Sequence, residues 1–98
     1  MSPRVRAAFR VTGRVQGVGF RWWAEAQAQA LGLAGFVRND PDGAVSGWAE
    51  GEAAAMAAFR SRLVEGPSSA RVADVAWDVD AGQETGSQSL PFPFEIHR

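Results

Sequence analysis

The sequence contains no cysteine and a single histidine, His97, among its 98 residues. Without cysteine the chain has no disulfide bond, no thiolate nucleophile and no zinc site built on cysteine. One histidine also leaves a Ser-His-Asp triad, or a metal site built on several histidines, hard to assemble. Any chemistry that this chain performs must therefore rely on other side chains and on the backbone.

Long apolar segments are absent as well. The longest apolar run, Ala53–Phe59, is far shorter than the roughly 20 residues that cross a bilayer as a helix. The N-terminal segment, MSPRVRAAFR, lacks the apolar core of a signal peptide. We therefore expect a cytoplasmic protein that does not associate with a membrane.

Lysine is missing too, so that all ten basic residues are arginine. Residues 1–38 hold six arginines and one acidic residue, whereas residues 39–98 hold four arginines and ten acidic residues. The formal net charge is −1, without the basic excess that nucleic-acid-binding domains usually carry. This distribution argues against a nucleic-acid partner and is compatible with a small anion drawn to the arginine-bearing half.

The remaining composition, 46% hydrophobic and 21% charged, is ordinary for a globular protein, and we expect residues 1–98 to form a single domain. Alternating apolar and polar residues predict strands, and apolar residues at helical spacing predict helices. The expected strands are Val5–Val15, Gly35–Asn39, Ala44–Glu50, Arg71–Asp80 and a short edge strand within residues 92–96; the expected helices run from the glycine loop to Gly32 and over Glu52–Glu65; a turn is expected at Asp40–Gly43 and an irregular loop at Ala81–Leu90.

This order, β-α-β-β-α-β with a short extra C-terminal strand, predicts an α+β fold. Both helices must cover one face of an antiparallel sheet, as in the ferredoxin-like sandwich. The first strand then lies between the third and the fourth, and its arginines are expected to face acidic residues of the fourth strand on the open face. The expected partners are Arg6, Arg10 and Arg14 on one side and Asp74, Asp78 and Asp80 on the other.

A glycine-rich loop, within GRVQGVGFR (Gly13–Arg21), joins the first strand to the first helix. Backbone N–H groups of such a loop and of a helix N-terminus bind anions, and an arginine guanidinium adds a fork that fits phosphate. The loop is neither a Walker A motif nor a dinucleotide fingerprint. On the residues alone, an anion site with Arg21 and a plain glycine-rich turn are about equally compatible with this pattern.

Asn39, which precedes the turn, is the second candidate site residue. Asparagine before a turn more often bonds to the local backbone than to a ligand. If the strand pattern persists, the neighbouring Arg38 faces the opposite side of the sheet, which leaves Arg21 as the better ligand for an anion.

Four segments together resemble the acylphosphatase family: GRVQGVGFR (Gly13–Arg21), LGLAGFVRN (Leu31–Asn39), DGAVSGWAEG (Asp42–Gly51) and FEIHR (Phe94–Arg98). The resemblance implies the ferredoxin-like sandwich and hydrolysis of the carboxyl–phosphate bond of acyl phosphates, with no cofactor and no metal. It also implies that Arg21 and Asn39 are catalytic. The implied phosphate-binding residues are Gln16, Gly17, Val18, Gly19, Phe20 and Arg21.

This chemistry suits a chain with so few reactive side chains. An acyl phosphate releases a carboxylate, whose acid has a pKa of roughly 4, so that the leaving group needs no general acid. Phosphoryl transfer depends mainly on positioning and on stabilising charge. Arg21 and the loop amides would supply the charge stabilisation, and the Asn39 amide would orient the attacking water.

Two other functions compete with this interpretation. A binding module would capture a phosphorylated partner without turning it over, as acylphosphatase-like domains at the front of larger maturation proteins suggest. A nucleic-acid-binding sheet would need aromatic residues stacked on the open face, where Trp48 is the one candidate. We expect a small-molecule acyl phosphate as the substrate and a monomeric protein.

The other aromatic residues and His97 have plainer interpretations. Trp23 and Trp77 lie on apolar stripes and are expected in the core, whereas Trp22 falls off the helix stripe and is expected at the rim of the site. His97 is near the chain end and is expected to be solvated.

Overall fold

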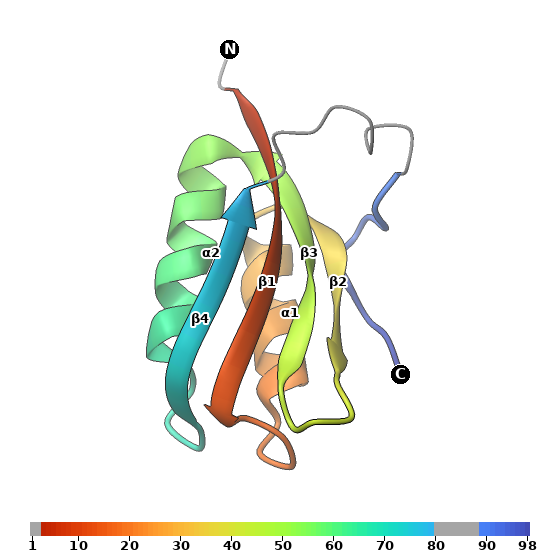
Figure 1. Ribbon diagram of the computed structural model, residues 1–98. Helices are drawn as coiled ribbons and strands as arrows, with labels where there is room; N and C mark the ends of the chain where they lie inside the picture. Colours follow the sequence, from red (N-terminus) through yellow and green to blue (C-terminus); the bar gives the residue numbers. More distant parts are fainter. Residues whose placement is uncertain (1–2, 80–88) are drawn as a thin grey trace.

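Within residues 3–79 and 89–98, which the computed structural model describes, the chain forms a five-stranded sheet with two helices on one face (Figure 1). The sheet order is β4-β1-β3-β2-β5. The elements are β1 (Arg4–Arg14), α1 (Phe20–Ala30), β2 (Ala34–Asn39), β3 (Val45–Glu52), α2 (Ala53–Glu65), β4 (Arg71–Val79) and β5 (Glu95–Ile96). This confirms the predicted ferredoxin-like α+β fold, including the first strand between the third and the fourth.

Strand β1 is central because it pairs antiparallel with β3 on one side and with β4 on the other. Its odd-numbered residues Ala7, Phe9 and Val11 are buried against the helices, while the even-numbered residues lie on the open face. Phe9 contacts Phe59 of α2 edge-on, with ring centroids 5.6 Å apart. The alternation seen in the sequence therefore separates a core face from an open face, as expected.

Both helices bury one residue per turn against the sheet. In α1 these residues include Ala24 and Ala28, and in α2 they are Met56, Phe59 and Leu63. Helix α1 ends at Ala30 in the predicted Schellman-type motif, in which Gly32 has a φ of 72° and the amide of Leu33 donates to the Ala28 carbonyl at 3.0 Å. The termination fixes where β2 begins, and with it the position of Asn39 at the far end of that strand.

The C-terminal segment forms the predicted edge strand. Strand β5 pairs parallel with β2, and the amide of His97 donates to the Val37 carbonyl at 2.8 Å. Phe94 is fully buried and lies against Phe59, with ring centroids 5.8 Å apart. The His97 side chain is 39% exposed, in keeping with the expected solvation, and its ring also stacks on Phe36 with centroids 4.4 Å apart. Backbone pairing and this ring contact hold the tail against the sheet.

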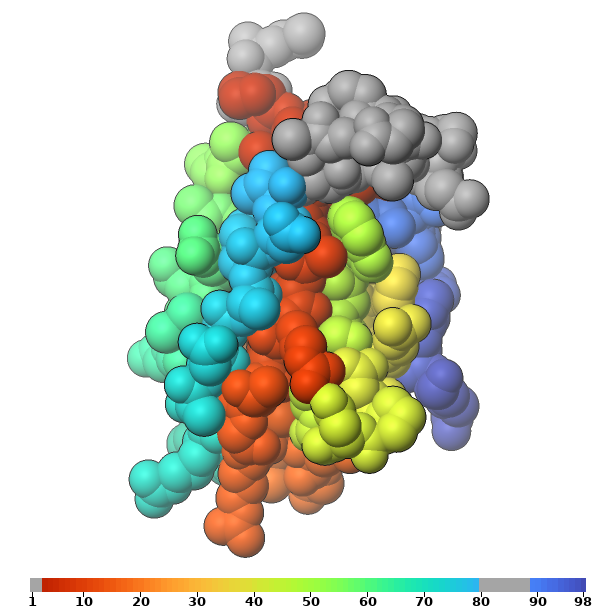
Figure 2. Space-filling model, viewed as in Figure 1, coloured from red at the N-terminus to blue at the C-terminus, as the bar shows by residue number. Residues whose placement is uncertain are grey.

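The open face of the sheet carries the charged residues of the strands that are discussed next. Figure 2 shows this face, with β4, β1, β3 and β2 side by side and no helix in front. The expected pairing of the β1 arginines with Asp74 and Asp78 is wrong. Arg6 pairs with Glu50 of β3 at 3.2 Å, and Arg10 binds Asp40 and Asp42 of the turn after β2. In the observed register Arg10 lies opposite Ala76, so that the β4 carboxylates are only diagonal neighbours.

The remaining expectations about the open face concern Trp48 and the loop Ala81–Leu90. Trp48 shares this face with Ser46 and Glu50 and is partly covered. Residues 81–88 of the expected loop, and Asp80, lie outside the described residues. Neither helix of the described part of the chain is long and apolar enough to cross a membrane.

Candidate active site

The glycine loop and Asn39 meet at one end of the sheet. Strands β1 and β2 are both antiparallel to the intervening β3, so they run in the same direction and end at the same edge. The loop of residues 15–19 follows β1, and Asn39 is the last residue of β2. Both lie at the lower end of the sheet in Figure 1. Topology thus brings together two segments that are about twenty residues apart in the sequence.

A cavity of about 230 Å³ lies at this edge, and we call it the loop cavity. Its lining residues are Val15, Gly17, Gly19, Phe20, Arg21, Trp22 and Asn39. Five of the predicted site residues are therefore brought together around one space: two loop glycines, Phe20, Arg21 and Asn39. Gln16 and Val18 are not part of its lining.

The loop backbone has the conformation that exposes amides. Gly17 and Gly19 have φ values of 75° and 79°, in the left-handed region that other residues rarely adopt. A Cβ atom at either position would meet no atom within 4 Å. Glycine is required at these positions for its backbone conformation and not because the surroundings are crowded.

The first residues of helix α1 line the loop cavity, and their backbone amides are unpaired within the helix. Its first internal hydrogen bond runs from the Trp23 amide to the Gly19 carbonyl at 3.0 Å, so the amides of Phe20, Arg21 and Trp22 have no acceptor within the helix. No side chain caps this end and no acidic residue lies in the first turn. The partial positive charge of the helix N-terminus is therefore available to an anion.

Arg21 adds a full positive charge at the same place. Its guanidinium is partly buried, and Nη1 donates to the carbonyl oxygen of His97 at 3.1 Å. Across residues 3–79 and 89–98 no carboxylate pairs with Arg21. The C-terminal segment thus holds one N–H of the fork, and the charge is left uncompensated. An anion in the loop cavity would supply the missing partner.

Asn39 differs from the ordinary asparagine before a turn. The turn is closed by the backbone, with the Asp40 amide donating to the Ala44 carbonyl at 2.8 Å. Within the described part of the chain the Asn39 side chain makes no hydrogen bond to the protein. Arg38 lies on the other face, where it contacts Asp40 at 3.4 Å. The carboxamide of Asn39 is therefore available to a ligand in the loop cavity.

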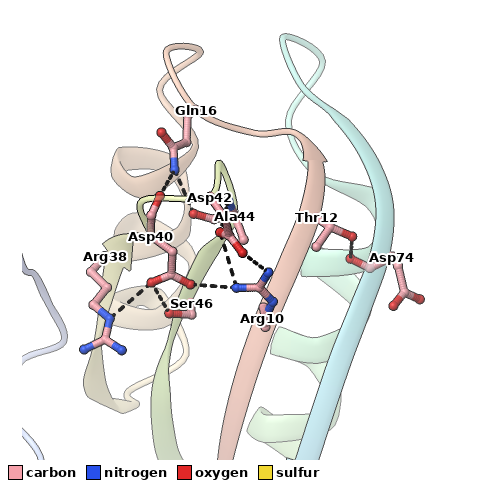
Figure 3. Close-up of polar contacts among 9 residues, drawn as sticks. All are labelled: Arg10, Thr12, Gln16, Arg38, Asp40, Asp42, Ala44, Ser46 and Asp74. Atoms are coloured by element: carbon pink, nitrogen blue, oxygen red, sulfur yellow. Dashed lines mark hydrogen bonds and ion pairs between the residues drawn. The ribbon is translucent and has the colours of Figure 1, made fainter.

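Gln16 connects the two segments from outside the cavity (Figure 3). Its Nε2 donates to the backbone carbonyls of Asp40 and Ala44, both at 2.8 Å. Asp40 in turn accepts from Arg10 at 3.1 Å and from Ser46 at 2.9 Å. Gln16 thus ties the glycine loop to the turn that follows Asn39. Val18 is held differently, because its carbonyl accepts from the Ser69 hydroxyl at 2.8 Å.

One contributor to the site, the backbone carbonyl of His97, has no signal in the sequence. The carbonyl of His97 orients Arg21, and no pattern of side chains can reveal a backbone acceptor. Trp22 lines the loop cavity although it is 71% exposed, in keeping with its predicted place at the rim. The described residues include no group of three or more histidine, aspartate or glutamate side chains that could hold a metal ion.

The turn after Asn39 is also stabilised electrostatically. Hydrogen bonding from Arg10, followed by that from the Ala44 amide at 3.1 Å, holds the pKa of the Asp42 carboxyl below its ordinary value. The same pair raises the pKa of Arg10. The charged form of Asp42 is therefore favoured in the folded protein.

Replacing Asp42 with asparagine should lower the melting temperature at neutral pH and have less effect in acid. Because the pKa of Asp42 is lower in the folded than in the unfolded chain, its stabilising contribution is present above about pH 4 and is lost as the pH falls through the folded pKa. Thermal melts of both proteins at about pH 7 and about pH 3 test this. Asp78→Asn, at an exposed carboxylate of β4, is the control. If the difference in melting temperature between the parent and Asp42→Asn is the same at both pH values, the lowered pKa of Asp42 is contradicted.

A ferredoxin-like sandwich with a cationic, amide-lined cavity at the start of its first helix defines a class of small α+β proteins. A family model for acylphosphatases matches residues 7–88. An acylphosphatase of Mesorhizobium japonicum is 50% identical over 76 residues, which cover 76% of this chain and 81% of that protein. The structure of an acylphosphatase from Coxiella burnetii superposes with a TM-score of 0.84 at 30% identity, covering 96% of this chain and 93% of that one.

The chain belongs to the acylphosphatase family. The predicted family, fold and enzyme class, an acylphosphatase hydrolase, are thereby confirmed. A longer protein also matches: full-length HypF, solved in its phosphate- and nucleotide-bound form, superposes with a TM-score of 0.81 at 26% identity. That match covers 100% of this chain and 12% of HypF.

Proposed function

We propose that this protein hydrolyses small acyl phosphates at the loop cavity, with Arg21 and Asn39 as its catalytic residues. One observation carries the proposal. Within the described part of the chain, a guanidinium without a carboxylate partner, the free amides of a helix N-terminus and a carboxamide without a hydrogen bond line the same space of about 230 Å³. Such donors suit a tetrahedral dianion, and the family to which the chain belongs is named for the matching reaction.

The phosphoryl group would be bound by the backbone and by Arg21. The amides that follow Gly17 and Gly19, two glycines that line the cavity, would donate to phosphoryl oxygens, and the Arg21 fork would donate to two of them. As the bond to the leaving group breaks, negative charge spreads over the phosphoryl oxygens. Donors that are already in place stabilise that charge without reorganising.

Asn39 would position the nucleophile. Its carboxamide oxygen can accept a hydrogen bond from a water molecule and its NH₂ can donate to a phosphoryl oxygen, so that the water lies in line with the bond that breaks. The water oxygen then forms a bond to phosphorus. The electron pair of the P–O bond leaves with the acyl group as a carboxylate, and the water protons pass to the phosphate and to solvent. The products are a carboxylate and inorganic phosphate.

No protein group needs to protonate the leaving group in this reaction. A carboxylate whose acid has a pKa of roughly 4 departs as the anion at neutral pH. The residues that line the loop cavity suit a reaction without a general acid, because they supply hydrogen-bond donors and a positive charge. The reaction therefore relies on electrostatic stabilisation and orientation.

A turnover assay tests the proposal. The purified protein, with excess chelator present, should release inorganic phosphate from acetyl phosphate with repeated turnover, and added divalent cations should not raise the rate. Phosphate release that requires an added metal, or none at all above the spontaneous rate, would overturn the proposal. The folded state is checked in the same samples by circular dichroism.

The match to HypF, which was solved with phosphate bound, favours a second candidate function, that of an accessory module which binds phosphate or an acyl phosphate without hydrolysing it. The same assay separates the two candidates. Protection of the protein against thermal unfolding by phosphate, without turnover of acetyl phosphate, would favour the binding module. Turnover favours the enzyme.

A further inference from the structure

A second, larger cavity adjoins the loop cavity. It has a volume of about 550 Å³ and is lined by Arg21, Trp22, Glu25, Glu95, Ile96 and Arg98; we call it the outer cavity. Arg21 and Trp22 line both spaces, so the two cavities meet at these side chains. A volume of this order is typical of sites for small organic ligands.

Trp22 is the most unusual residue of this pair of cavities. It is 71% exposed, although it stands on a helix whose Ala24 and Ala28 are buried in the core. An indole left in solvent beside a cluster of unpaired donors presents a flat apolar surface, and among the described residues no ring or cation stacks on it. Ile96, a partly buried residue of β5, also lines the outer cavity. Together they give the cavity one aromatic wall and one aliphatic wall.

The charges around the outer cavity do not select for a second anion. Once a phosphoryl group has neutralised Arg21, the remaining ionised residues are Glu25, Glu95 and Arg98, with a small negative balance. Glu95 is further engaged by the His97 ring at 2.7 Å. Electrostatics would mildly disfavour an acyl group that ends in a carboxylate or phosphate, whereas an uncharged apolar group meets no such penalty.

We infer that the outer cavity binds the acyl group of the substrate, that Trp22 is its specificity-determining residue, and that a flat apolar acyl group is preferred. The inference rests on the proposed function, because it needs the phosphoryl group in the loop cavity. The carbon chain of an acyl phosphate held there extends past Arg21 and Trp22 into the outer cavity. An aromatic acyl group then lies against the indole of Trp22.

The test compares benzoyl phosphate with acetyl phosphate for the parent protein and for Trp22→Ala. The ratio of kcat/KM for benzoyl phosphate to that for acetyl phosphate should fall roughly tenfold in the variant, as expected for the loss of one aromatic contact. Most of the change should appear in KM, since the contact is made in the ground state as well. Trp22→Phe keeps an aromatic wall and should retain most of the parent ratio.

Val64→Ala is the matched control, because Val64 is another exposed apolar residue, 57% exposed, on α2. Its substrate ratio should equal that of the parent. A Trp22→Ala protein with the parent ratio, or a parent that prefers succinyl phosphate to benzoyl phosphate, would overturn the inference and leave the proposed function standing. A parent that hydrolyses neither acetyl nor benzoyl phosphate would overturn both. Because the Trp22 side chain is largely exposed, its loss should leave the melting temperature close to that of the parent.

Discussion

Replacing Arg21 with alanine should lower kcat/KM for an acyl phosphate by about 10³-fold or more, the range found when a phosphoryl-binding arginine or an equivalent donor is removed. The size of the effect follows from the surroundings of the guanidinium. Across the described chain no carboxylate forms an ion pair with it, and the helix amides beside it cannot replace a full positive charge. Inhibition by inorganic phosphate should weaken in parallel, because the same group binds the ground state.

The stability of this variant should separate loss of function from loss of fold. A cation at a helix N-terminus opposes the helix dipole, so removing it should not destabilise α1, although the contact with the His97 carbonyl is lost. We expect a melting temperature within a few degrees of the parent value. Arg14→Ala, at an exposed arginine at the same end of β1, is the control and should keep full activity. An Arg21→Ala protein within tenfold of the parent rate would contradict the assigned role.

Arg21→Lys offers a finer test of the same site. Lysine keeps the charge but cannot form two parallel hydrogen bonds with phosphoryl oxygens. It also cannot place one donor on the His97 carbonyl while presenting the rest of a rigid fork to the substrate. A lysine variant that is nearly as impaired as the alanine variant would show that geometry matters as much as charge.

Most of the fold was predictable because its determinants are local. The alternation of Ala7, Phe9 and Val11 defines the core face of β1, and Gly32 ends α1 where the helix would otherwise continue. The order of the elements then leaves few ways to cover one face of a sheet. These features are short-range and periodic, and each is visible in the sequence before any coordinates.

The pairing of charges on the open face was not predictable in the same way. The sequence shows arginines on β1 and acids on β4, but cross-strand pairing depends on register, which places Arg10 opposite Ala76 and, after a β-bulge between Thr12 and Gly13, Arg14 opposite Arg71. The turn after β2 brings Asp40 and Asp42 over Arg10 instead. The position of a turn relative to the sheet depends on tertiary contacts, and here Gln16 makes such contacts with the carbonyls of Asp40 and Ala44.

The residues proposed for the candidate site were named from the sequence, whereas the backbone contact that holds Arg21 was not. The glycine spacing and Arg21 are compatible with an anion site but equally with a plain turn, and only the acylphosphatase resemblance favours the site and makes Asn39 part of it. That His97 lies beside Arg21 depends on β5 pairing parallel with β2, a contact between residues about sixty positions apart. A histidine near the chain end carries no pattern that would predict its backbone contact with Arg21 or its stacking on Phe36.

Replacing Asn39 with alanine should reduce kcat by about 10²-fold or more while leaving inhibition by phosphate nearly unchanged. This split follows from the assigned role, since the carboxamide acts on the attacking water and the phosphoryl group is bound by other donors. The Asn39 side chain is exposed and makes no hydrogen bond to the described part of the protein, so the fold should not depend on it.

The contrast between kcat and phosphate affinity also distinguishes Asn39 from Arg21, whose loss should affect both. Asn39→Asp is the informative second variant. It conserves size but places a carboxylate beside a dianion, and the repulsion should weaken phosphate binding as well as turnover. Arg38→Ala, one residue earlier and on the opposite face of β2, is the matched control and should behave like the parent. An Asn39→Ala protein that turns over at the parent rate would remove the water-orienting role and leave the orientation of the nucleophile to the loop backbone.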